Sequence, residues 1–117
     1  MFNAGLGDIS LGLQIAGFSI IAAYEADSKA AAIHEANIEA PIFPRLPEKI
    51  DEEMISIADL LAVRLAYLQP SLSLRKKDGK AGFDADDFLR LLEVCRPKAF
   101  LVILGMVENM SLSAMIF

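Results

Sequence analysis

The residues with the clearest capacity for chemistry lie in the segment NAGLGDISLGLQIAGF, residues 3–18. Gly5 and Gly7 permit positive φ angles and let the backbone come close to a ligand. The helix predicted after this loop directs its free N–H groups and the positive end of its dipole toward it. The segment therefore predicts a loop beside which a carboxylate group of a ligand is well placed.

A carboxylate of the protein itself is expected next to this loop. Residues 18–24, FSIIAAY, form a short apolar run rich in strand-forming residues, and Glu25 follows at its C-terminal end. In doubly wound folds an acid at this position commonly accepts hydrogen bonds from both hydroxyl groups of a ribose. The alternative is a glycine-rich turn between ordinary elements with a solvated Glu25, because a G-x-G pair alone is a weak signal.

Two helices and one strand must position these residues. Apolar residues at helical spacing predict a first helix over residues 9–16, with Asp8 or Ser10 as its cap and Gly17 as the left-handed residue that ends it. A second helix is predicted in DSKAAAIHEAN, residues 27–37. Loop, helix, strand, acid and helix thus follow in the order of a nucleotide-binding α/β unit.

Composition limits the classes of protein to which the chain can belong. The chain has 117 residues, 55% of them apolar, which predicts one globular domain at most. Its net charge of −5 disfavours long-range attraction to nucleic acid. Cys95 is the only cysteine, which argues against a disulfide and a thiolate metal cluster and fits a reducing compartment. Without a signal peptide or a membrane span in the sequence, the chain is predicted to be cytoplasmic.

Two longer strings resemble the cytosine C5 DNA methyltransferases. AGLGDISLGLQIAGF followed by AAYEADSKAAAIHEAN is similar to the family's first motif, approximately F-A-G-x-G-G-x-x-x-G-L, and to its second, which has E-x-D before a helix ending in Asn. GKAGFDADDFLRLLEVCRPKAFLV, residues 79–102, resembles the stretch in which a G-K-x-x-G-F-D loop leads through a helix to R-P-K-A-F. The resemblance touches both halves of the chain.

The resemblance implies an α/β, Rossmann-like domain that binds S-adenosylmethionine. In such proteins the glycine loop and the acid hold this methyl donor, so a specific cofactor is implied where the pattern alone indicated a nucleoside. The residues to which the cofactor contacts carry over are Ala4, Gly5, Leu6, Gly7, Glu25 and Ala26.

Two departures from the family motif are expected to weaken cofactor binding. Asn3 stands where the family usually has a phenylalanine against the cofactor. Asp8 stands where the second glycine of the pair is expected, which puts a negative charge near the carboxylate of the methionine part.

The catalytic residues of the family are missing. Its nucleophile is a cysteine in a P-C-Q segment, which attacks C6 of a flipped-out cytosine. The alignment of Gln69 with that glutamine puts Leu68 at the nucleophile, and Leu68 cannot form the adduct. The glutamate that contacts the base follows R-P-K-A-F in the family, where this chain has Ile103. Glu108 could supply that acid only if five extra residues intervene.

The remaining residues of interest are more simply explained without catalysis. Cys95 shares a helical face with apolar residues and is predicted to be a buried structural thiol. The cluster LRKKDGK, residues 74–80, occupies what would be a DNA-facing loop, although such clusters are more often solvated surface. His34 lies in the middle of the second helix, where a packing or surface role is expected rather than catalysis.

Two features of the sequence conflict with the family's fold. Only Met1 and Phe2 precede Asn3, so the first, central strand should be largely missing and the sheet open in its middle. Residues 50–68 show a helical apolar period, whereas the family predicts a strand from about Asp59. In such a strand Arg64 would be poorly placed, so helix and strand both stay open there.

Residues 1–117 are therefore interpreted as one partial methyltransferase-like domain, truncated and degenerate. The family transfers a methyl group from S-adenosylmethionine to cytosine C5 in DNA, as in restriction–modification systems. This chain is expected to be inactive alone, with no metal and no membrane partner, and DNA is implied as a partner only by the family. The alternatives are a non-catalytic interaction or regulatory module and one half of a split methyltransferase that pairs with a second chain.

Overall fold

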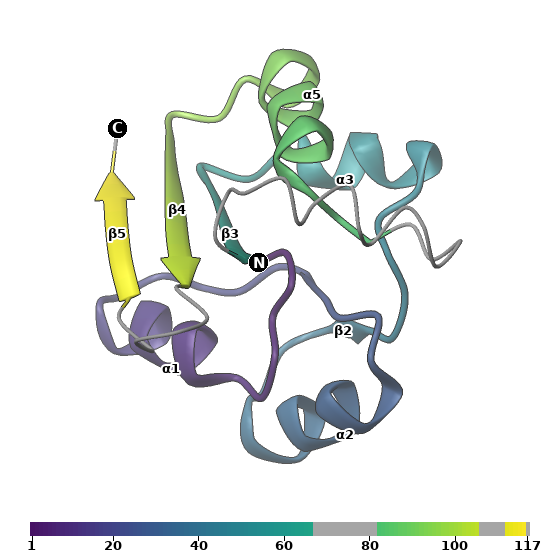
Figure 1. Cartoon of the computed structure of the whole chain (residues 1–117), viewed down its shortest axis with the longest axis vertical. Helices are drawn as coiled ribbons and strands as arrows, with labels where there is room; N and C mark the ends of the chain where they lie inside the picture. Colours follow the sequence, from purple (N-terminus) through teal and green to yellow (C-terminus); the bar gives the residue numbers. More distant parts are fainter. Residues whose placement is uncertain (67–81, 106–111, 117) are drawn as a thin grey trace.

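The computed structural model describes residues 1–66, 82–105 and 112–116, and these form an α/β arrangement (Figure 1). Strand β1 pairs in parallel with β2, β3 pairs in parallel with β4, and β4 pairs with β5 in the antiparallel sense. The strands in chain order are β1 (Ala23–Tyr24), β2 (Ile42–Phe43), β3 (Leu60–Ala66), β4 (Ala99–Gly105) and β5 (Leu112–Ile116).

The first residues of the chain join the two groups of strands. Phe2 donates its N–H to the carbonyl oxygen of Ala62 at 2.8 Å and accepts from the N–H of Arg64 at 3.2 Å. On its other side, the N–H of Tyr24 donates to the carbonyl oxygen of Met1 at 2.9 Å. Phe2 thus forms parallel bridges with both β1 and β3. The first residues form no strand, as predicted, and the strands fall into a two-stranded and a three-stranded sheet that the isolated bridges of Phe2 connect.

The helices cover both faces of these strands. They are α1 (Asp8–Ile15), α2 (Ser28–Asn37), α3 (Glu52–Ile55), which follows a 3₁₀ turn at Lys49–Asp51, and α5 (Ala85–Cys95). Figure 1 shows α3 and α5 on one side of the strands and α1 and α2 on the other.

Alternate residues of the strands supply two apolar clusters, as the period of two in a strand requires. Phe2, Tyr24 and Val63 face the larger cluster, to which α3 and α5 contribute. Ala23 and Ala62, their neighbours in the sequence, face the smaller cluster with α1. The chain therefore builds a core on each face of a thin sheet.

Helix α1 begins differently from the sequence prediction. Gly7, with φ of 107°, is the residue before the helix, and no side chain caps it. Asp8 and Ser10 instead lie inside the helix, so their predicted capping role was wrong. The predicted end is confirmed: Gly17 has φ of 102°, and its N–H donates to the carbonyl oxygen of Gln14 at 3.0 Å.

The two elements that follow α1 agree with the prediction in part. Of the run 18–24, only Ala23–Tyr24 forms a strand. Helix α2 is capped by Asp27, whose carboxylate accepts from the N–H of Lys29 at 2.9 Å. These two elements bring Glu25 to the carboxyl end of β1.

The ambiguous segment 50–68 divides between helix and strand. Helix α3 ends at Ile55, and β3 starts at Leu60, close to the place that the family resemblance predicts. The helical period was misleading because Ile50 and Ile57 are 80% and 73% exposed and belong to no buried face. The strand forms because β3 has a backbone partner on each side.

We predict that Phe2→Ala lowers the free energy of unfolding by about 3–5 kcal/mol, because a large side chain that is 2% exposed is lost from the core. Its ring stacks on those of Tyr24 and Phe83, with centroids 5.7 and 5.0 Å away. Urea denaturation followed by circular dichroism measures this change. Leu89→Ala, at a side chain 56% exposed on α5, is the control and should change stability by about 0.5 kcal/mol or less. Equal losses in the two variants would contradict the central place of Phe2.

Candidate functional site

The glycine loop lies at the carboxyl end of the Met1–Ala4 segment and has an unusual backbone. Asn3, Gly5 and Gly7 have φ angles of 51°, 60° and 107°. A Cβ atom on Gly7 would lie 2.8 Å from Cγ1 of Ile38, so both space and conformation demand glycine there. A Cβ atom on Gly5 would lie 3.3 Å from Nη1 of Arg64. The loop therefore keeps its backbone close to two neighbouring elements.

Glu25 holds this loop through its carboxylate. Oε1 accepts the N–H of Gly5 at 2.8 Å, and Oε2 accepts the N–H of Asp27 at 2.8 Å. An ionised carboxylate offers about four lone-pair positions, so each oxygen can still accept one further hydrogen bond. Glu25 is half-buried, which leaves it accessible to a ligand. The capacity to accept from two hydroxyl groups is therefore present.

The other predicted cofactor residues occupy different environments. Ala4 is fully buried in the smaller cluster, below the loop. Leu6 is 55% exposed at the top of the loop, and Ala26 is exposed beyond Glu25. The structure brings Gly5 and Glu25 into direct contact, whereas Leu6 and Ala26 flank this pair.

Asn3 fixes the loop to two other parts of the chain. Its Nδ2 donates to the carbonyl oxygens of Arg64 at 2.9 Å and Phe83 at 3.0 Å. Asparagine tolerates the left-handed conformation better than most residues, which suits its φ of 51°. Asn3 thus positions the loop relative to β3 and to the segment before α5, a role that the family resemblance does not predict.

Arg64 and Asp8 form an ion pair beside the loop. Nη2 of Arg64 lies 2.6 Å from Oδ2 of Asp8, and the two side chains are 30% and 61% exposed. Desolvation raises the pKa of Asp8, but the hydrogen bond and charge of Arg64 outweigh it and hold that pKa below its ordinary value. The negative charge expected of Asp8 is therefore largely compensated. The sequence indicates that Arg64 would be poorly placed in a buried strand, yet Arg64 lies in β3 and its side chain reaches the loop at the end of that strand.

A buried polar pair lies below the loop. Ser10 and His34, both fully buried, approach at 2.8 Å between Oγ and Nε2, and this contact joins α1 to α2. Nδ1 of His34 has no hydrogen-bond partner among the described residues. Burial, followed by the charge of the N-terminal amino group, lowers the pKa of His34 against the opposing effect of Glu25. His34 is therefore a packed residue, as the sequence indicated.

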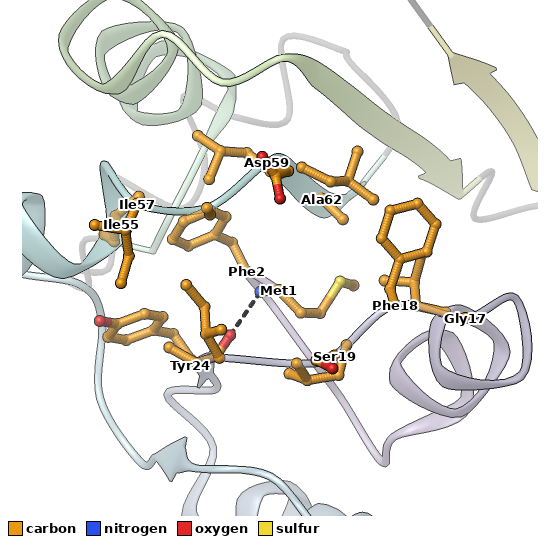
Figure 2. A pocket seen from close by; sticks show the side chains of 17 residues that line it. Met1, Phe2, Gly17, Phe18, Ser19, Tyr24, Ile55, Ile57, Asp59 and Ala62 are labelled. Carbon is orange, nitrogen blue, oxygen red and sulfur yellow. Dashed lines mark hydrogen bonds between the residues drawn. The ribbon is translucent and has the colours of Figure 1, made fainter.

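A pocket of about 330 Å³ lies at the opposite, amino ends of the strands (Figure 2). Phe18, Ile55 and Leu61 are among its mostly apolar lining residues. The amino group of Met1 donates to the carbonyl oxygen of Ala22 at 2.8 Å there, and burial lowers its pKa to about 5. None of the loop glycines lines this pocket, and neither does Glu25. We therefore place the candidate site at the loop, where the groups that can recognise a ligand converge.

Several predicted features fall outside the described residues. These are the expected nucleophile position Leu68, the basic cluster 74–80 and the alternative acid Glu108. Of the catalytic substitutions, only Ile103 is described, and it is buried in β4. Cys95 is also buried, at the end of α5, which confirms the prediction of an inaccessible thiol.

Among the residues that the structure describes, no three His, Cys, Asp or Glu side chains are grouped so that they could hold a metal ion. No helix in the described part is long and apolar enough to span a membrane. No family model matches the sequence, and no curated protein and no solved structure matches it either.

We predict that His34 makes stability fall as pH falls below about 6.5, the ordinary pKa of histidine. Because the folded-state pKa is lower than this, the unfolded chain binds more protons between the two values, so the contribution of His34 to the free energy of unfolding is fully present above 6.5 and declines below it. Met1, whose pKa is lowered to about 5, acts in the same direction.

The contribution of His34 is isolated by comparison with His34→Gln, since the chain has only one histidine. Urea denaturation at pH 7.5 and 5.5 should show a smaller loss of stability in this variant than in the wild type. An equal loss in both proteins would show that His34 does not cause the pH dependence.

Proposed function

We propose that the chain is the S-adenosylmethionine-binding portion of a protein of the cytosine C5 DNA methyltransferase type, with a Rossmann-like topology. The observation that carries this proposal is the contact between Glu25 and Gly5, which joins the acid after β1 to the glycine loop at the same edge of the strands. The sequence motifs alone single out both residues. The parallel pairing of β1 with β2 and of β3 with β4 supports the topology.

The residues present fit the nucleoside part of this cofactor. Glu25 retains two acceptor positions, the number needed for the two hydroxyl groups of a ribose. Gly5 and Gly7 give the loop its positive φ angles and let its backbone lie close to the side chains of Arg64 and Ile38. When bound, S-adenosylmethionine supplies an electrophilic methyl group; the residues of this chain would bind and orient it.

A second candidate function is a non-catalytic interaction or regulatory module, or one half of a split methyltransferase. Exposed apolar side chains favour a protein partner: Phe18, Ile21 and Ile57 are 45%, 40% and 73% exposed around the pocket at the amino ends of the strands. This surface lies away from the loop, so cofactor binding and partner binding are compatible.

We predict that Glu25→Gln weakens the binding of S-adenosylhomocysteine by about 1.5–3 kcal/mol, roughly a ten- to hundredfold rise in Kd, because hydrogen bonds to a charged acceptor are lost. Isothermal titration calorimetry measures the Kd. The loss should be much smaller for the 2′-deoxy analogue, which lacks one of the hydroxyl groups. Glu35→Gln, at an exposed position of α2, is the matched control and should bind as the wild type does.

Two results would contradict this prediction. If neither ligand binds the wild type at millimolar concentration, the cofactor proposal fails and the interaction module is preferred. If Glu25→Gln weakens the binding of both ligands equally and the melting temperature of the variant also falls, Glu25 acts only by holding the loop.

We further predict that the purified chain transfers no methyl group from labelled S-adenosylmethionine to DNA, because Leu68 stands at the expected nucleophile position. Leu68→Cys alone should not restore transfer, since Ile103 stands where the base-contacting glutamate is expected. Incorporation of label above a control without protein, abolished by boiling, would overturn this expectation.

A further inference from the structure

Arg64 contacts the glycine loop with both its backbone and its side chain. Its carbonyl oxygen accepts from Asn3, and its Nη1 lies 3.3 Å from the position that a Cβ of Gly5 would occupy. In the register of the sheet Arg64 lies opposite Ile103 of β4, and its N–H donates to Phe2 on the other side. The backbone of Arg64 is therefore fixed on both sides, and its guanidinium stays at the loop.

Only part of the hydrogen-bonding capacity of Arg64 is used. Nη2 donates to Asp8, and Nε is buried without a partner among the described residues. A guanidinium has five N–H donors in a planar fork that matches a carboxylate. The group can therefore receive a carboxylate in addition to, or in place of, that of Asp8.

Asp8 is the more exposed member of the pair. Its side chain is 61% exposed, twice the value of 30% for Arg64, and it stands on the first turn of α1. A short, exposed side chain can turn to solvent without disturbing the strands. An ion pair of this exposure is weak, so a competing carboxylate can displace Asp8.

We infer that Arg64 binds the carboxylate of the amino-acid part of the ligand. When that ligand is absent, the carboxylate of Asp8 occupies the same position on Arg64. This inference rests on the proposed function, because the nucleoside part must lie at the loop and Glu25. Asp8 then acts as an internal competitor. It makes the site selective for ligands whose carboxylate can replace it.

Three ligands test this inference by calorimetry. S-adenosylhomocysteine carries the carboxylate, its decarboxylated analogue keeps the amino group alone, and methylthioadenosine has neither. Asp8→Asn should tighten the binding of S-adenosylhomocysteine by up to about fivefold, the contribution expected of an exposed ion pair. The binding of methylthioadenosine should not change. Arg64→Gln should weaken the binding of S-adenosylhomocysteine about tenfold relative to that of the decarboxylated analogue, since a charge-assisted contact is lost. Arg64→Lys should restore part of this preference.

The matched control is Asp59→Asn, which removes one acidic charge from the exposed pair of Asp59 and Lys98, 2.9 Å apart. It should change none of the three affinities. The inference is overturned if Asp8→Asn weakens both ligands that carry an amino group, because Asp8 then binds that amino group, or if Asp8→Asn shifts all three ligands equally. If methylthioadenosine does not bind the wild type, the proposed function itself fails and the inference with it.

Discussion

The candidate site depends on the backbone pairing of Phe2 with two strands at once. Hydrogen bonds to Ala62 and Arg64 on one side, and the bridge to Tyr24 on the other, align the first residues with β1 and β3. The loop leaves the carboxyl end of this segment, so its position is set by the same hydrogen bonds. The buried ring of Phe2 then joins this pairing to the larger apolar cluster. This short segment is enough to align β1 with β3, because the backbone of Phe2 bridges both strands and its ring packs in the larger cluster.

The electrostatics of the loop follow from this alignment. Parallel strands end at a common edge, so Glu25 after β1 and Arg64 near the end of β3 lie on either side of the loop. Glu25 accepts from the backbone of Gly5, while Arg64 is paired with Asp8. One side of the loop therefore offers acceptors and the other offers donors. This polarity suits a ligand that carries hydroxyl groups at one end and a carboxylate at the other.

Local signals in the sequence predicted the parts of the site that depend on local chemistry. Gly7 and Gly17 were identified correctly as positions that need positive φ, because each acts on its immediate neighbours in the sequence. The pair of Arg64 and Asp8 could not be found in this way, since 56 positions separate the two residues. The bridges that Phe2 forms between the two sheets were missed for the same reason, because its partners lie in distant segments. An arginine near the end of a predicted strand, where burial disfavours it, was the available signal for a functional side chain.

The cost of the loop argues that it is more than a connection between a strand and a helix. Three residues within five positions have positive φ, and one of them is Asn3, which pays an energetic penalty that glycine would avoid. Contacts from three separate elements hold this conformation: Glu25 on Gly5, and the carbonyl oxygens of Arg64 and Phe83 on Asn3. A plain turn into α1 would need no such support. A non-glycine residue in the left-handed region, held by converging polar groups as Asn3 is, favours a binding site over a plain turn, so ligand titration of this loop is a more direct test of function than any assay of methyl transfer.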